Sequence, residues 1–463
     1  MSKPFYITTT LPYVNSDPHI GFAMEIIRAD IIARFKKAQD YDVFFNTGTD
    51  EHGIKIYRKA LEQGIDPQTY VDGYAQKFKD LIPALHISPD IHFIRTTNPQ
   101  HIKNAQAFWA ECDKKGFIYK KKYQVKYCVG CELEKTDSEL VNGKCSIHPN
   151  QDIELIDEEN YFFKFSSFKK PLLDLYEKNP KLVIPDFRFN EIKAFVGRGL
   201  EDFSISRLAS KMPWGVPVPN DSEHVMYVWF DALVNYIFKK EAWQSGAVQY
   251  CGKDNLRQQS AMWQAMLIAV GMEPSRHIII NGFITMNGQK ISKSTGNVVN
   301  PSELISLYGA EALRYHVARE FNPFEDSDFT FEAFKTAYNA NLANGIGNLS
   351  SRIIQMVLAN NIPIVIPQHS FDPAFVTAME NFNIKEAADF IWRKIAETDA
   401  FIQREEPFKK IKTDVQGATK DLQYLLAELT NIAYHLSPIM PETSKEIFTA
   451  LELKRKPLLF PRK

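Results

Sequence analysis

The order of apolar patterns in the first 53 residues constrains the fold more than any other feature of this sequence. An aromatic and β-branched run, FYITTTLPY at 5–13, precedes IGFAMEIIRADIIARFKKA at 20–38, where apolar residues recur at helical spacing with charges on the other face. A second strand-like run, YDVFFNTGTDEHG at 41–53, ends in a Gly/Thr/Asp turn. Strand, helix and strand in this order predict a parallel βαβ unit.

The carboxyl ends of the two predicted strands are the expected ligand site, because ligands of open parallel sheets bind at that edge. Both strands end in residues that can contact a ligand, and the helix begins just after a histidine. We therefore expect one crevice to be lined by Leu11, Tyr13, His19, Asp50 and His52.

Four segments with different patterns follow one another along the chain. With 463 residues, the chain is too long to fold around one hydrophobic core. A second series of strand and helix patterns at 224–286 is separated from the first by a lysine-rich stretch, and helical stripes run from about 325 onward. We predict an α/β Rossmann-type domain split by an insertion and followed by an all-α helix bundle, with the segments 1–116, 117–220, 221–324 and 325–463.

The composition argues against a membrane protein and against a strongly basic nucleic-acid binder. The net charge is −1, no apolar run approaches the roughly 20 residues that span a bilayer, and MSKPFYITTT lacks the order of a signal peptide. We therefore expect a cytoplasmic protein with no membrane partner. Basic runs at 119–127, 408–412 and 453–463 suit a phosphate-binding track, although such runs are more often solvated surface.

Four soft metal ligands occur as two short pairs in YCVGCELEKTDSELVNGKCSIHP at 127–149. Each pair, Cys128 with Cys131 and Cys145 with His148, places two ligands on one side of a turn, and two pairs complete a tetrahedral zinc shell. An odd number of cysteines in a chain without a secretory signal argues against disulfides. Because no open coordination position is indicated, we predict one structural Zn²⁺.

A loop with two lysines, NGQKISKSTGN at 287–297, follows the apolar run HIIINGFITM. Lys290 and Lys293 stand three positions apart, and two ammonium groups suit a polyphosphate whose charge builds up during transfer. Taken alone, the loop fits an exposed basic turn equally well.

Together with Pro18-His19-Ile20-Gly21, this loop resembles the paired signatures of class I aminoacyl-tRNA synthetases, most specifically those of the methionyl-tRNA synthetases. The stretches TTTLPYVNSDPHIGF, FFNTGTDEHGIKI, HVMYVWFDALVNY, CGKDN and NGIGNLSSR occur in the family's order, so the resemblance covers nearly the whole chain. It implies that ATP, with Mg²⁺, and methionine form methionyl-adenylate, and that tRNA(Met) accepts the methionyl group. The ending resembles that of the family's minimal core, which implies a monomer.

The resemblance also implies roles for individual residues. The catalytic residues would be His19, Lys290 and Lys293. The residues at ATP would be His19, Gly21, Phe22, Gly252, Asp254 and Lys293. The residues at methionine would be Leu11, Tyr13, Asp50, Trp229, Tyr236 and Gln259, although Trp229 and Tyr236 also fit ordinary core packing. The anticodon would be read by Asn348, Arg352 and Phe408, the last in place of a tryptophan.

Several departures from the family pattern fall inside the expected active site. Phe22 replaces the second histidine of the nucleotide signature and cannot donate a hydrogen bond, so we expect reduced activity with ATP binding retained. Gln258 and Gln259 replace an apolar residue and a pocket histidine, and Asn255 and Gln264 replace an apolar residue and a proline. These changes leave two alternatives open. One is a paralogue for another amino acid or a resistance form with an altered methionine pocket; the other is a catalytically silent tRNA-binding protein.

Overall fold

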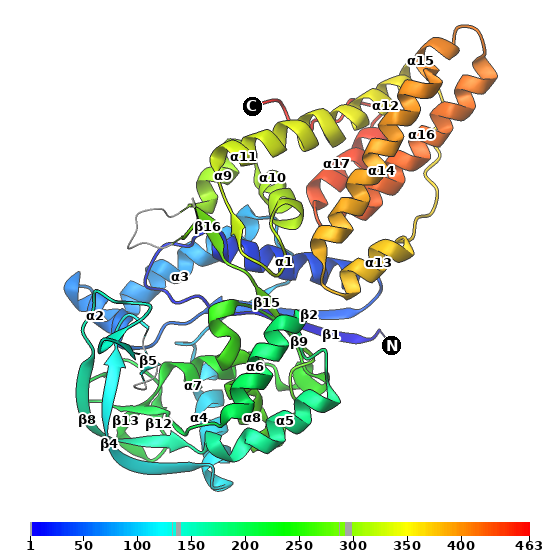
Figure 1. Ribbon diagram of the computed structural model, residues 1–463. Coiled ribbons are helices and arrows are strands. Elements are labelled where there is room, and N and C mark those ends of the chain that lie inside the picture. The colour runs from blue at the N-terminus through cyan, green and yellow to red at the C-terminus, as the bar shows by residue number, and fades with distance from the viewer. Residues whose placement is uncertain (1, 132, 136–139, 287, 292–298) are drawn as a thin grey trace.

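A parallel sheet of six strands lies at the centre of the molecule (Figure 1). The structure, a computed structural model, describes residues 2–131, 133–135, 140–286, 288–291 and 299–463. Every neighbouring pair of strands in the sheet runs parallel. The strand order is β3 (His92–Arg95), β2 (Asp42–Thr49), β1 (Pro4–Thr9), β14 (Val248–Gly252), β15 (His277–Asn281) and β9 (Val183–Ile184).

The predicted βαβ unit is confirmed, because β1, α1 (Ile20–Lys37) and β2 follow one another and Ile7 pairs with Phe45 in parallel register. Alternate residues of β1 belong to two separate cores. Phe5 and Ile7 join the core on the α1 face, whereas Tyr6 joins the opposite core. Covering both faces explains why successive residues of the strand, Phe5, Tyr6 and Ile7, are all apolar and buried rather than alternating with exposed polar ones.

Helices cover both faces of the sheet (Figure 1). The first face carries α1 and α3 (Pro67–Ala84), and α2 (Ile54–Glu62) precedes α3 in the chain. The second face carries α4 (Pro99–Lys114), α5 (Lys169–Lys178), α6 (Asp186–Arg198), α7 (Val228–Leu233) and α8 (Trp263–Val270). Short 3-10 and π turns are η2 (Phe165–Phe168), η3 (Val234–Ile237), η4 (Lys240–Ser245), η5 (Lys253–Asn255) and η6 (Gln258–Met262).

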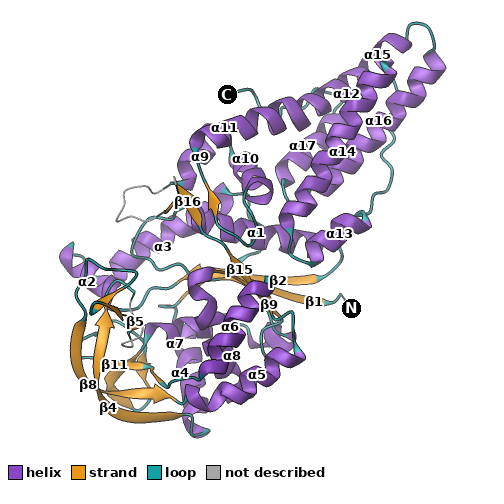
Figure 2. Cartoon of the chain, viewed as in Figure 1, coloured by secondary structure: helices purple, strands orange, loops and turns teal. Residues whose placement is uncertain are grey.

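The segment predicted as an insertion forms smaller antiparallel sheets (Figure 2). Its centre is the long pair β4 (Ile118–Cys128) and β8 (Glu154–Phe163). Strand β9 of the same segment pairs with β15, so the central sheet draws one edge strand from it. The other strands are β5 (Leu133–Glu134), β6 (Leu140–Val141), β7 (Lys144–Cys145), β10 (Phe203–Ser204), β11 (Ser206–Leu208), β12 (Pro217–Val218) and β13 (Asp221–Met226).

The last third of the chain is helical, as the apolar stripes predict (Figure 2). A small sheet of β16 (Ile284–Met286), β17 (Gln289–Lys290) and β18 (Ser327–Asp328) precedes it. The helices and turns are α9 (Pro301–Tyr308), α10 (Ala310–Tyr315), η8 (His316–Glu320), α11 (Phe331–Ala337), η9 (Tyr338–Gly347), α12 (Asn348–Ala359), α13 (Pro373–Glu380), α14 (Ile384–Glu405), α15 (Pro407–Lys410), α16 (Val415–Leu436) and α17 (Pro441–Glu452). None of the helices in the described part of the chain is long and apolar enough to cross a membrane.

The charged face of α1 is buried against the helical region rather than exposed to solvent. Asp30 of α1 pairs with Arg314 of α10 at 2.8 Å, and both side chains are 0% exposed. Burial alone would raise the pKa of Asp30, but Arg314 holds it below its usual value. Arg314 also donates to the backbone oxygens of Pro438 and Ile439. Removing one partner of such a pair typically costs about 3 kcal/mol, so this link fixes the helices to the sheet.

Candidate active site

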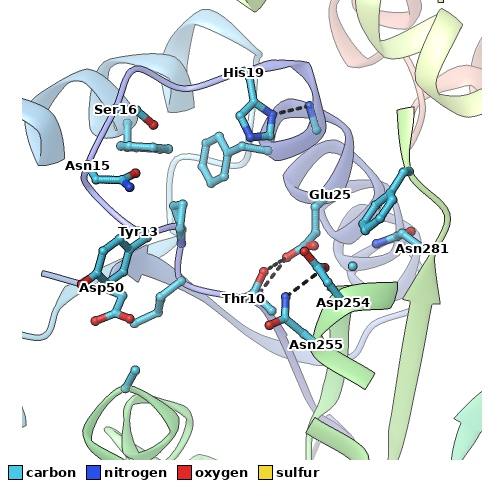
Figure 3. A pocket seen from close by; sticks show the side chains of 18 of the residues that line it. Thr10, Tyr13, Asn15, Ser16, His19, Glu25, Asp50, Asp254, Asn255 and Asn281 are labelled. Carbon is cyan, nitrogen blue, oxygen red and sulfur yellow. Dashed lines mark hydrogen bonds between the residues drawn. The ribbon is translucent and has the colours of Figure 1, made fainter. Parts of the chain in front are cut away.

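A cleft of about 520 Å³ lies at the carboxyl ends of the central strands (Figure 3). Of the residues expected around the crevice, Leu11, Tyr13, His19 and Asp50 line it. His52 is not among the lining residues and instead lies behind Tyr13, whose hydroxyl donates to the His52 backbone oxygen at 2.7 Å. The βαβ argument therefore placed four of its five residues in the correct crevice.

His19 forms the N-cap of α1 and folds its ring over the first turn (Figure 3). Its Nδ1 accepts from the Gly21 amide at 3.0 Å. A Cβ at position 21 would lie 2.8 Å from the His19 ring, which explains the glycine. A ring that accepts at Nδ1 is the tautomer with its proton on Nε2, so His19 can donate from that nitrogen to an anion at the helix N-terminus.

Phe22 lines the same part of the cleft but makes no polar contact there. Its ring is only 8% exposed and meets Phe78 of α3 edge to face, with centroids 5.0 Å apart and planes at 88°. The departure from the histidine of the family pattern is thus absorbed by aromatic packing.

Glu25 is a lining residue that the sequence analysis missed (Figure 3). Both the backbone N–H and the hydroxyl of Thr10 donate to its Oε1, at 2.8 and 2.5 Å. Burial raises the pKa of Glu25 to about 8, against the lowering effect of the Thr10 hydrogen bonds, and the charge of Asp254 adds to the rise. A carboxylate four residues after Gly21, in the otherwise apolar stretch 20–27, was the signal that could have identified it.

The ends of β14 and β15 supply the opposite wall of the cleft. Gly252 and Asp254 both line it, and a Cβ at position 252 would lie 2.7 Å from Asp254 Oδ1. Asn281, also missed from sequence, lines the cleft and accepts from the buried Arg28 at 2.8 Å. Because Gly252 has no Cβ, the Asp254 carboxylate has room to fold back along the end of β14.

The residues predicted for methionine form the other end of the cleft. The described structure places all of them on its lining: Leu11, Tyr13, Asp50, Trp229, Tyr236 and Gln259. Asp50 is held by backbone hydrogen bonds with Pro12 and Val14 on the neighbouring segment. Trp229 is half-buried on α7, which ends at Leu233 and passes into the 3-10 turn η3 that carries the buried Tyr236.

The substituted glutamines lie at this end and inside the protein. Gln259 is 1% exposed, and its Nε2 donates to the Tyr236 hydroxyl at 2.7 Å. Gln258 and Gln264 are buried but are not among the residues that line the cleft. Gln259 lies in the π turn η6, a geometry that occurs often at functional sites.

A buried carboxylate with two histidines lies behind the methionine end. Asp231 of α7 contacts His52 Nδ1 and His101 Nε2, each at 2.6 Å. Burial alone would raise the pKa of Asp231, but the two imidazoles hold it at about 2. Because Tyr13 is bonded to the His52 backbone, this cluster braces the segment that carries Tyr13 and Asp50.

The two-lysine loop begins beside the cleft. Lys290 belongs to β17, which pairs with β16, and the next residue, Ile291, lines the cleft. The side chain of Lys290 and the whole of Lys293 lie outside the described residues. Their assignment to catalysis therefore stays a prediction.

The four predicted metal ligands converge in space. One ligand atom each of Cys128, Cys131, Cys145 and His148 lies within 4.8 Å of the others. Cys131 Sγ is 3.3 Å from Cys145 Sγ and 3.2 Å from His148 Nδ1, separations that suit a tetrahedral zinc site with its Zn–S bonds of about 2.3 Å. A Cβ on Gly130 would lie 2.5 Å from the His148 ring, so the turn needs a glycine.

The cluster of three cysteines and one histidine borders the cleft. Gly130 and Cys131 are lining residues, and Lys55 of α2 donates to the Gly130 backbone oxygen at 3.3 Å. The antiparallel segment therefore contributes to the wall of the cleft, which its sequence alone did not indicate.

The three residues predicted to read an anticodon lie in the helical region, on elements that do not line the cleft. Asn348 is exposed at the start of α12, and Arg352 lies one turn later. Arg352 is held by Asp399 of α14, whose second carboxylate oxygen accepts from Gln403. Phe408 is 45% exposed in the short helix α15 that follows α14.

Comparisons with a family model, with similar sequences and with solved structures agree with one another. The family model described as tRNA synthetases class I (M) matches residues 5–148 and 130–354. The methionine–tRNA ligase of Thermotoga maritima is 39% identical over 98% of this chain and 76% of its own length, and that of Synechocystis sp. is 38% identical over 96% and 89%. The Mycobacterium tuberculosis methionyl-tRNA synthetase in complex with methionyl-adenylate is 31% identical, covers 100% of this chain and 99% of its own, and superposes with a TM-score of 0.89.

Proposed function

The chain belongs to the class I methionyl-tRNA synthetases, and from that premise we propose that it joins methionine to tRNA(Met) in two steps. In the first, the methionine carboxylate attacks the α-phosphorus of ATP, a new P–O bond forms and pyrophosphate leaves. In the second, a hydroxyl of the terminal adenosine of tRNA attacks the carbonyl carbon and AMP leaves. One observation carries the proposal: a single cleft combines the nucleotide loop, a buried carboxylate and an apolar, aromatic pocket.

ATP is assigned to the end of the cleft at the start of α1. His19 donates to a phosphate oxygen, and the free N–H groups of the first helical turn favour the anion. Gly21 allows close approach, and Gly252 and Asp254 lie beside the ribose. Lys290 and Lys293 offset the charge that develops on the leaving pyrophosphate. Mg²⁺ accompanies the ATP phosphates.

Methionine is assigned to the opposite end. Asp50 accepts from its ammonium group, and Leu11, Tyr13, Trp229 and Tyr236 pack around the thioether, a group that aromatic rings hold well. The cluster of Asp231 with His52 and His101 positions Tyr13 and Asp50. Because the backbone that carries Tyr13 and Asp50 is already held in place, less conformational entropy is lost when the substrate binds.

The helical region is assigned to tRNA. Asn348 and Arg352 stand on one helix face, where they can bond to splayed bases, and Phe408 offers a ring for stacking. The Asp399 contact orients the Arg352 guanidinium. A cytoplasmic location remains the expectation from the sequence.

We assign the cysteine and histidine cluster to one structural Zn²⁺, which would cross-link the turn beside the cleft. Metal analysis of the purified protein should give one zinc per chain. Cys145→Ser should lose it, whereas Cys112→Ser, at a buried cysteine outside the cluster, should keep it. Full zinc retention by Cys145→Ser would contradict the assignment.

Charging of tRNA tests the whole proposal. A transcript whose anticodon reads the methionine codon should accept labelled methionine, and the same transcript with an altered anticodon should not. Arg352→Ala should raise the KM for tRNA at least about tenfold without changing adenylate formation, since one charged contact is lost. A protein that binds both transcripts and charges neither would be a tRNA-binding protein without ligase activity.

A further inference from the structure

A chain of buried hydrogen bonds connects the cleft to the backbone behind it. Its side chains come from β14, from the turn before β15, from η6 and from α8, and all are at most 5% exposed. Three of them, Gln249, Gln264 and Ser275, are absent from the cleft lining. The chain ends at the Tyr236 hydroxyl, which lines the cleft.

The direction of this chain is fixed at its inner end. The Ser275 backbone N–H can only donate, and it bonds to Gln264 Oε1 at 2.9 Å. Gln264 Nε2 must therefore donate, and its partners are the Gln259 backbone oxygen and the Ser275 hydroxyl oxygen, both at 2.8 Å. The Ser275 hydroxyl then donates its own proton to Gln249 Oε1.

The same logic runs outward to the cleft. Because Gln249 Oε1 accepts, its Nε2 is the atom that donates to Gln259 Oε1, at 3.1 Å. Gln259 Nε2 in turn donates to the Tyr236 hydroxyl oxygen at 2.7 Å. The Tyr236 oxygen is thus an acceptor toward the protein, and in the described part of the chain no protein acceptor takes its proton. Burial raises the pKa of this hydroxyl well above 10, so the proton stays in place.

We propose that Gln249, Gln264 and Ser275 are positioning residues that orient the Gln259 amide so that Tyr236 presents its hydroxyl proton to the substrate side chain. The inference rests on the proposed function and explains how the site would distinguish methionine from amino acids with other side chains. A thioether sulfur accepts a hydrogen bond weakly, whereas the methylene of norleucine, its near-isostere, accepts none. The oriented proton therefore favours methionine over a hydrocarbon side chain of the same length, and apolar packing alone discriminates poorly between such isosteres.

The test is the ratio of kcat/KM for methionine to kcat/KM for norleucine in pyrophosphate exchange. Ser275→Ala breaks the chain, and Gln249→Glu keeps its shape but cannot donate to Gln259, so the amide of Gln259 is free to reverse. Each variant should lower the ratio about three- to tenfold, the worth of one neutral hydrogen bond. Gln258→Met, at a buried glutamine next to the chain but outside it, should leave the ratio unchanged.

A double-mutant cycle separates positioning from a general structural role. In a Tyr236→Phe background the donor is absent, so adding Ser275→Ala should lower the ratio no further. Equal losses for both amino acids in Ser275→Ala and Gln249→Glu, with the ratio unchanged, would overturn the proposal. If the wild-type protein shows no methionine-stimulated exchange at all, the proposed function fails. The role in substrate choice that we propose for the chain of hydrogen bonds then fails with it.

Discussion

The two ends of the cleft have accommodated changed residues in opposite ways. At the nucleotide end, Phe22 packs against the ring of Phe78. At the methionine end, Gln259 is bonded to Tyr236 and to Gln249 in a buried polar chain. One end has lost a polar group and filled the space with an apolar contact, whereas the other has exchanged one polar group for another and satisfied it.

The difference teaches that a substitution must be judged by what its neighbours offer. A buried amide costs stability unless its polar atoms have hydrogen-bond partners. In Gln259 both have one, because Oε1 accepts from Gln249 and Nε2 donates to Tyr236. Phe22 needs only packing. Four predictions test this contrast, and the first concerns the polar residue that the nucleotide end retains.

His19→Asn should have the largest effect. Asparagine keeps an acceptor that can cap α1 but removes the imidazole that would donate to phosphate. Pyrophosphate exchange should fall by about two to three orders of magnitude, the cost of one oriented donor in a transition state. The thermal midpoint should stay near that of the wild type. Exchange within about threefold of wild type would mean that His19 is only a helix cap.

Glu25 should make stability depend on pH. Burial raises its pKa from the usual 4.5 to about 8, so the folded state holds this proton to higher pH than the unfolded chain does. The stability that Glu25 contributes is therefore full below about pH 4.5 and is lost as pH rises toward 8.

Urea unfolding of wild type and Glu25→Gln at pH 5 and pH 7.5 measures this effect. Glutamine is neutral and keeps the acceptor for Thr10, so the wild type should lose about 3 kcal/mol more than the variant between the two pH values. Parallel pH profiles of the two proteins would mean that Glu25 is ionised in the folded state.

Phe22→His restores the family residue at the nucleotide end, yet its gain should be small. The position is 8% exposed and faces Phe78, so an imidazole there loses the aromatic contact and is poorly placed for phosphate. We expect less than a tenfold rise in exchange and a loss of about 1 kcal/mol in unfolding free energy. A hundredfold rise would show that the missing histidine limits this enzyme.

Gln259→His is the matching reversion at the methionine end and should have the smallest effect. A neutral imidazole carries one donor and one acceptor, so it can bond to both Tyr236 and Gln249 as glutamine does. The kcat/KM for methionine should stay within about threefold of wild type, measured by exchange at pH 8. A larger loss would mean that the chain of hydrogen bonds depends on the reach of the glutamine side chain.

Much of this arrangement could be predicted from sequence because it depends on local patterns. The βαβ unit follows from apolar spacing in the first 53 residues, and the convergence of Cys128, Cys131, Cys145 and His148 follows from two short pairs. In each case the residues are close in sequence, so geometry within a turn or a helix brings them together.

The rest depended on contacts between distant segments. Asp30 and Arg314 lie 284 positions apart and meet only because α1 is covered by the helical region. Ser275 and Gln249 likewise meet only when β14 and β15 pair. The sequence showed that Gln259 and Gln264 were unusual, but it did not contain the partners that explain them.

Pyrophosphate exchange into ATP, run with each amino acid separately and with none, tests the central claim most directly. The account predicts exchange that methionine alone stimulates, because the two ends of one cleft bind ATP and a thioether side chain. Stimulation by a different amino acid, or no exchange with any from folded, zinc-loaded protein, would contradict it.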